Sequence, residues 1–285
     1  MRVSGYIRQR MLQYALNIPI FLYSRRKGRG RSLYTKERNR NFYQPLLKEI
    51  ERQFNQADGN ELFYSSKGDL PKIHAVHSSS ALVVNLFAYW FHNPIPIAAA
   101  CRLCSSRTRR PMIMEFEVKL PIRDDFPRAP NIDVLFRVED DPRFQAFAVE
   151  SKFSEPFTGR SHGGLNPAYL DQDLWVNLSN LRQFATQLSQ RYHIFKYLHA
   201  AQLLKHILGL RNAFGKRFKL LYLYYDAFGQ EGAMHQEEIM RFRQVARLDR
   251  VWFYALSHQE LINHLADHYR DSHQKYIHYI TSRYF

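Results

Sequence analysis

The stretches Pro130-Asn131-Ile132-Asp133-Val134-Leu135-Phe136 and Phe147-Ala148-Val149-Glu150-Ser151-Lys152-Phe153 decide the fold. Both are apolar runs typical of β-strands, and both contain acidic residues, which strands usually lack. Between them, Glu139-Asp140-Asp141-Pro142-Arg143 is a strong turn sequence. The pattern therefore predicts a β-hairpin over residues 131–153.

The geometry of this hairpin brings charged side chains together. If the chain reverses between Asp141 and Pro142, Asp133 lies opposite Glu150, with Cβ atoms roughly 4.5–5.5 Å apart. Lys152 lies two residues after Glu150 and therefore shares its strand face. Two carboxylates this close raise each other's pKa, and Mg²⁺ would relieve the repulsion because it binds carboxylates, water and phosphate oxygens. A slip of one residue would turn Asp133 to the other face.

Asp133 together with Glu150-Ser151-Lys152 resembles the motif of the PD-(D/E)XK superfamily of restriction-endonuclease-like nucleases, with Asn131-Ile132-Asp133 in place of Pro-Asp. More of the chain, over about residues 72–257, resembles a bacterial group of restriction endonucleases. The resembling stretches are His77–Ala81, Asn85–Phe87, Phe116-Glu117, Pro130–Leu135, Glu150–Pro156, Ala201–His206 and Leu220–Tyr224. The resemblance implies an α/β fold with a central mixed β-sheet flanked by helices, and a Mg²⁺ site that Mn²⁺ can also fill.

The resemblance also implies roles for the hairpin residues. Asp133, Glu150 and the Ser151 carbonyl would bind the metal. Lys152 would orient or deprotonate the attacking water, or neutralise charge on the phosphate. The alternative is a surface ion pair at a strand end.

Three further residues follow from the same resemblance. Glu117 matches an additional acid, with Glu115 as the alternative on the same predicted strand. Gln202 matches a helix glutamine, and Lys205 lies on nearly the same helix face, where it could contact phosphate. The alternatives are a solvated carboxylate for Glu117 and ordinary helix-surface polarity for Gln202 and Lys205.

Charge is concentrated near the N-terminus. The net charge is +15, and residues 1–40 hold eleven Lys or Arg residues against the single acid Glu37. The run Arg25-Arg26-Lys27-Gly28-Arg29-Gly30-Arg31 is typical of a flexible arm that contacts phosphates, and a solvated tail is the alternative. We expect a basic arm over 1–40, a nuclease-like domain over 41–258 and a helical extension over 259–285.

The expected elements alternate strands with helices. Helices are expected over 41–54, 78–91, 173–190, 192–210 and 231–248, one or two more over 259–282, and a helical turn over 7–15. Further strands are expected over 113–120, 218–225 and 251–256. Asn93-Pro94-Ile95-Pro96 is expected to end the second helix.

Other patterns are weaker. His74, His77, Cys101 and Cys104 have zinc-ligand spacing, with buried thiols as the alternative. Ser79 and its neighbours cap a helix whose N-terminus could also hold a phosphate. With only two cysteines, a disulfide scaffold is excluded. No apolar run is long enough to span a membrane, so no membrane span is expected. A cytoplasmic location is therefore expected.

These observations lead to one expected function and one alternative. The first is a Mg²⁺-dependent nuclease that hydrolyses phosphodiester bonds of DNA in restriction or DNA processing. The second is a nucleic-acid-binding protein with the same fold and no cleavage. DNA is the expected partner, no membrane is expected, and a homodimer is left open.

Overall fold

A computed structural model describes residues 2–18, 33–59, 61–124, 126, 129–159, 164–190 and 195–285. Its strands are β1 (Met112–Lys119), β2 (Asn131–Val138), β3 (Ala146–Lys152), β4 (Phe218–Tyr224) and β5 (Trp252–Ser257). Its helices are α1 (Val3–Asn17), α2 (Lys48–Gln56), α3 (Ser79–Phe87), α4 (Ile95–Ala100), α5 (Ser179–Gln190), α6 (Ala200–Phe214), α7 (Gly229–Leu248), α8 (His258–Tyr269) and α9 (Gln274–Tyr284).

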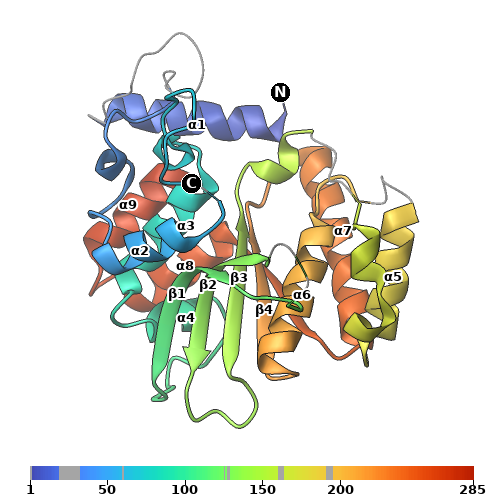
Figure 1. The fold of residues 1–285 in the computed structure, drawn as a ribbon. Helices are drawn as coiled ribbons and strands as arrows, with labels where there is room; N and C mark the ends of the chain where they lie inside the picture. Colours follow the sequence, from blue (N-terminus) through green and yellow to red (C-terminus); the bar gives the residue numbers. More distant parts are fainter. Residues whose placement is uncertain are drawn as a thin grey trace.

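The five strands form one mixed sheet in the order β1-β2-β3-β4-β5. The first three strands are antiparallel, whereas β3, β4 and β5 run parallel. Helices α5, α6 and α7 cover one face, and α3, α4, α8 and α9 cover the other (Figure 1). The predicted α/β architecture with a central mixed sheet and flanking helices is confirmed.

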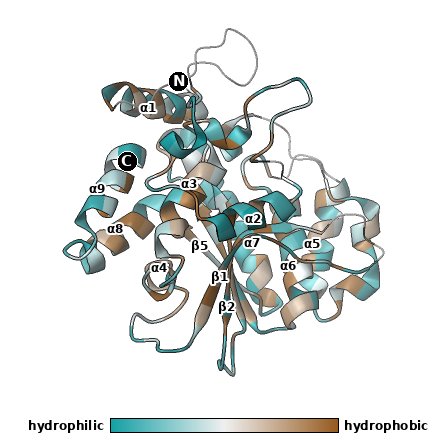
Figure 2. Cartoon of the chain, turned by 60° about the vertical axis from the view of Figure 1, so that its left-hand side comes forward, coloured by the Kyte–Doolittle hydropathy of each residue, from teal (hydrophilic) through white to brown (hydrophobic). Residues whose placement is uncertain are grey.

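Two hydrophobic clusters form the core, one on each face of the sheet. The central strands carry long hydrophobic segments, and many helices alternate hydrophobic with hydrophilic residues (Figure 2). Such strands are expected where both faces of a sheet are covered. The helices packed on both faces hold the carboxyl ends of β3, β4 and β5 together at one end of the sheet.

The termini join this core. Ile7, Met11 and Ala15 of α1 belong to the same cluster as Tyr276 and Ile280 of α9. The expected helical turn over 7–15 is therefore part of a 15-residue helix, since its three apolar residues recur every four positions and pack against the body. The expected division into arm, domain and extension stays a prediction.

The other expected elements occur with shifted ends. The helix expected over 41–54 starts only at Lys48, because Pro45 interrupts the backbone hydrogen bonding before it. The helix expected over 192–210 starts at Ala200. Pro94 and Pro96 end one helix as expected, but they also begin α4, since proline suits the first turn of a helix. No helix in the part of the chain covered by the structure combines the length and apolar character needed to cross a membrane.

Candidate active site

The β2–β3 hairpin has the predicted register. Val134 pairs with Val149 and Arg137 pairs with Ala146, and one further step in the same register brings Asp133 opposite Glu150. The carboxylate of Asp133 accepts a hydrogen bond of 2.7 Å from the Ser151 backbone N–H. The strand order thus places both acids at the same end of the sheet, as the sequence predicted.

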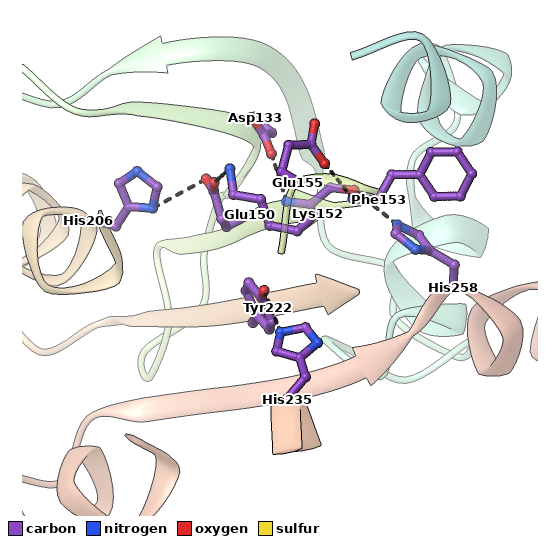
Figure 3. Close-up of polar contacts among 10 residues, drawn as sticks. Asp133, Glu150, Lys152, Phe153, Glu155, His206, Tyr222, His235 and His258 are labelled. Carbon is purple, nitrogen blue, oxygen red and sulfur yellow. Dashed lines mark hydrogen bonds and ion pairs between the residues drawn. The ribbon is translucent and has the colours of Figure 1, made fainter. Parts of the chain in front are cut away.

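Glu150 and Lys152 project from the same face of β3 and form an ion pair (Figure 3). The Glu150 side chain is 1% exposed and that of Lys152 is 13% exposed, so the pair is shielded from water. Apart from the Lys152 ammonium and the His206 ring, no polar partner of the Glu150 carboxylate is found among the described residues. A buried carboxylate with so few partners is costly to keep charged, and a bound cation would offset that cost.

Glu117 joins these residues from the neighbouring strand. The β1–β2 register is the same on both sides of Glu117, where Phe116 pairs with Val134 and Val118 pairs with Ile132, so Glu117 lies across from Asp133. Burial raises the pKa of Glu117 well above its usual value, and the nearby carboxylates of Asp133, Glu61 and Glu150 raise it further. Glu115, the alternative, instead forms an ion pair with Arg137.

The backbone of Glu117 changes the direction of side chains along β1. Its φ is +51°, in the left-handed region that non-glycine residues seldom adopt. Before it, Met114 and Phe116 pack in the cluster that includes α3. After it, Val118 and Leu120 pack in the cluster that includes α6. The strand therefore does not keep a simple alternation of faces, and strain of this kind is often found at functional sites.

Burial controls the protonation of the site. It raises the pKa of Asp133 well above its usual value, assisted by the charge of Glu150, and it also raises the pKa of Glu150. Burial acts in the opposite direction on Lys152, but the charges of Glu150, Asp133 and Glu155 outweigh it and raise the pKa of the ammonium. Lys152 is therefore a cation at neutral pH and is poorly suited to remove a proton.

His206 is a site residue that sequence reasoning missed. It lies on α6, with Nδ1 3.4 Å from Oε2 of Glu150 (Figure 3). Burial, assisted by the charges of Lys152 and Lys205, lowers its pKa to about 3, so the imidazole is neutral and forms no ion pair with Glu150 at neutral pH. Its position one turn after Gln202 is the signal that could have found it.

The other two predicted residues, Gln202 and Lys205, lie on α6. Gln202 precedes His206 by four residues on the same side of α6, and no contact of its side chain with the three acids is seen among the residues described. Lys205 is half-buried, with Nζ 4.8 Å from the centre of the Tyr169 ring. Burial lowers the pKa of Lys205.

The other face of β3 shows a separate interaction. The hydroxyl of Ser151 lies 3.0 Å from Nε2 of His258 at the start of α8. Burial lowers the pKa of His258 to about 3, so this imidazole is also neutral. The role of the Ser151 carbonyl as a metal ligand stays a prediction.

The remaining predicted contacts have mixed outcomes. Arg25, Arg26, Lys27, Arg29 and Arg31 lie outside the described residues. The helix start near Ser79 is capped by the hydroxyl of Ser78, which accepts a hydrogen bond from the Ala81 N–H. The ring of His74 bonds to the Thr35 carbonyl, and both cysteines are free thiols.

The carboxylates fit Mg²⁺ by their chemistry. Within the described ranges, no three His, Cys, Asp or Glu side chains are arranged to hold an ion together. Mg²⁺ does not require three, because it commonly takes one or two carboxylates and completes its shell with water and phosphate oxygens. Asp133 and Glu150 can supply those carboxylates, since they lie opposite each other on neighbouring strands.

Comparison with known proteins assigns the chain to a family. No curated protein and no solved structure matches the chain significantly. A family described as "Restriction Endonuclease associating with ARP" matches residues 8–285. The match includes every strand of the sheet and all residues of the candidate site. The chain therefore belongs to this restriction-endonuclease family.

Proposed function

We propose that this protein is a Mg²⁺-dependent nuclease that hydrolyses phosphodiester bonds of DNA. One observation carries the proposal: two buried carboxylates, Asp133 and Glu150, lie together at one end of the sheet with the ammonium of Lys152 paired to Glu150. A purely structural ion pair would not need the second carboxylate, because two buried carboxylates repel each other and reduce stability. Family membership supports cleavage of nucleic acid in restriction or DNA processing.

The side chains divide the work by their charge. A Mg²⁺ ion bound here would stabilise negative charge on the phosphate and activate water. Asp133 and Glu150 would hold that ion, with Glu117 placed to bind one of its water molecules. Lys152, which stays protonated, would neutralise charge on the scissile phosphate rather than act as a base. The neutral ring of His206 would pack beside the Glu150 carboxylate without adding charge to the site.

DNA as substrate is supported by charge. The net charge of +15 favours a polyanion, and most of the excess lies in residues 1–40. The arm from Arg25 to Arg31 would add affinity that depends on salt, without contributing to the chemistry. The family description names association with ARP, and a partner of that kind would act together with this nuclease.

The test is cleavage of supercoiled plasmid and linear DNA by purified protein with Mg²⁺, Mn²⁺ or EDTA. We expect metal-dependent cutting by the wild type and a loss of at least about a hundredfold in Glu150→Gln and Lys152→Met. The matched controls are Glu139→Gln, at the exposed hairpin turn, and Glu115→Gln, beside Arg137. Circular dichroism would verify folding of each variant.

Two results would overturn the assignment. Full cutting by folded Glu150→Gln would remove the proposed role of the carboxylate. Wild-type protein that binds DNA but never nicks it with either metal would favour the alternative, a nucleic-acid-binding protein without cleavage.

A further inference from the structure

A groove runs along the outer edge of β5, away from the candidate active site. It has a cavity volume of about 790 Å³ and lies between β5 and the C-terminal half of α7. Trp252 is three residues before Ala255, the β5 residue in line with Glu150 across β4. That offset is roughly 10 Å along the strands, and two strand spacings add roughly 10 Å across them. The groove is thus distinct from the acidic site.

Part of the groove is lined by exposed apolar side chains. Trp252 is 50% exposed and Met240 is 57% exposed, so large apolar side chains face solvent here. The rings of Trp252 and Tyr254 are nearly parallel, with an angle of 18° and centres 6.3 Å apart. Phe144 also contacts Trp252, with ring centres 5.6 Å apart and an angle of 85° between the ring planes. The indole is therefore held with exposed surface beside a second ring.

Arginines supply the polar groups around this surface. Arg243, Arg247 and Arg250 line the groove, and no acidic side chain from the described part of the chain does. The charge of Arg243 reaches the Tyr254 phenol, and Lys219 contacts the same ring with Nζ 6.0 Å from its centre. The occupant should therefore carry negative charge and present flat apolar surfaces.

We propose that this groove, defined by Met240, Arg243, Arg247, Arg250, Trp252 and Tyr254, binds single-stranded nucleic acid. Unpaired bases stack on exposed aromatic rings while arginines contact the phosphates between them. A duplex hides the faces of its bases and offers only its backbone to such a groove. An added peptide strand is a poorer match, since charged side chains at a sheet edge oppose strand pairing. This second site would hold unpaired strands beside the nuclease centre.

Tryptophan fluorescence provides a specific test, because Trp90 and Trp175 are both buried and only Trp252 is exposed among the three. Metal-free protein in EDTA is titrated with a short oligothymidylate, and anisotropy of a labelled copy gives the affinity. We expect the oligonucleotide to quench exposed tryptophan emission in the wild type and not in Trp252→Phe. Trp252→Ala should weaken binding about tenfold.

The arginine variants test the charged part of the groove. The double variant Arg243→Ala/Arg247→Ala should also bind about tenfold more weakly. The slope of its log affinity against log salt concentration should become shallower by the amount expected for about two phosphate contacts. Arg270→Ala, an exposed arginine at the end of α8, is the matched control and should bind as the wild type does. Thermal melts would verify that these surface changes leave the fold intact.

Three outcomes would overturn the proposal. The first is an oligonucleotide that leaves wild-type emission unchanged, or quenches Trp252→Phe equally. The second is quenching by a polyglutamate peptide and not by the oligonucleotide, which would indicate an acidic protein partner. The third is a dimer by light scattering that Trp252→Ala dissociates, which would indicate a second copy of this chain. None of these readouts depends on DNA cleavage.

Discussion

Replacing Lys152 by Met should destabilise the protein strongly at neutral and alkaline pH. In the structure the ammonium pairs with Glu150, whose side chain is 1% exposed, and lies near the charge of Asp133. Removal of one partner of a buried pair leaves an uncompensated charge and costs about 3–5 kcal/mol. A domain is typically stable by only about 5–15 kcal/mol, so the variant should lose a large part of its free energy of unfolding at about pH 8.

The loss should shrink as the pH falls. Burial raises the pKa values of Asp133 and Glu150, so the folded protein binds protons more readily than the unfolded chain does. Stability from these carboxyl groups is complete below the unfolded pKa of about 4 and is lost as the pH rises through the folded pKa. Without Lys152, these folded pKa values rise further. The free energy of unfolding of Lys152→Met should therefore increase as the pH is lowered from about 8 to about 5.

A second variant isolates the pair. In Lys152→Met/Glu150→Gln both charges are gone and a neutral amide remains, so the cost should be well below that of Lys152→Met alone. The coupling energy from the double-mutant cycle should reach about 2 kcal/mol or more. The measurement is urea unfolding followed by tryptophan fluorescence at both pH values. The matched control is Lys216→Met, an exposed lysine before β4.

The reasoning would be refuted by a Lys152→Met variant that unfolds at the wild-type urea concentration at about pH 8. It would also be refuted if Lys152→Met were at least as stable as Lys152→Met/Glu150→Gln. Addition of Mg²⁺ to Lys152→Met provides a further readout. If Asp133 and Glu150 bind the ion, Mg²⁺ should raise the urea midpoint of this variant and not that of the double variant.

Three further predictions concern positions around the site. Glu117→Gly should stabilise the fold by about 1 kcal/mol or more in urea unfolding at about pH 8, since glycine adopts the positive φ without strain and one repelling carboxylate is removed; equal stability would argue against both causes. Gly209→Ala should lower the melting temperature, at a cost of about 1–3 kcal/mol, because the new Cβ would lie 2.6 Å from the Leu120 carbonyl oxygen; an unchanged melting temperature would contradict this packing. His258 has a folded pKa of about 3, whereas the unfolded imidazole takes up a proton below its pKa of about 6.5. The free energy of unfolding of the wild type should therefore fall by about 2 kcal/mol between pH 7 and pH 5 because of this residue. In His258→Gln, which keeps a hydrogen-bonding group near Ser151, that part of the pH dependence should be absent from urea midpoints; its persistence would assign the titration to other groups.

The hairpin was predictable because its signals are local. The Asp-Asp-Pro turn fixes where the chain reverses, and the Asp141 carboxylate accepts hydrogen bonds from the Arg143 and Phe144 N–H groups as such turns require. Once the turn is placed, the spacing of Asp133 and Glu150 determines that they oppose each other. The mixed sheet and its flanking helices followed from the alternation of apolar strands and helices.

Features set by distant contacts could not be predicted in the same way. His206 faces Glu150 only because α6 packs on this face of the sheet, and the one local signal for it is its position one turn after Gln202. The left-handed backbone of Glu117 likewise reflects the fit between strands, since glutamate has no local preference for it. The groove at β5 joins α7 to the sheet edge, so its arginines and Trp252 meet only in the folded chain.

One buried side chain has a consequence for how the chain is made. Arg283, 1% exposed, donates hydrogen bonds to the carbonyl and the side-chain oxygen of Asn41. The amide of Asn41 in turn donates to the carbonyls of Ile73 and Ala75. During translation, the layer beside α3 and α9 can close only after residue 283 has left the ribosome. The opposite layer, whose last buried residue is Phe253, can pack earlier, so the two sides of the sheet should mature in sequence.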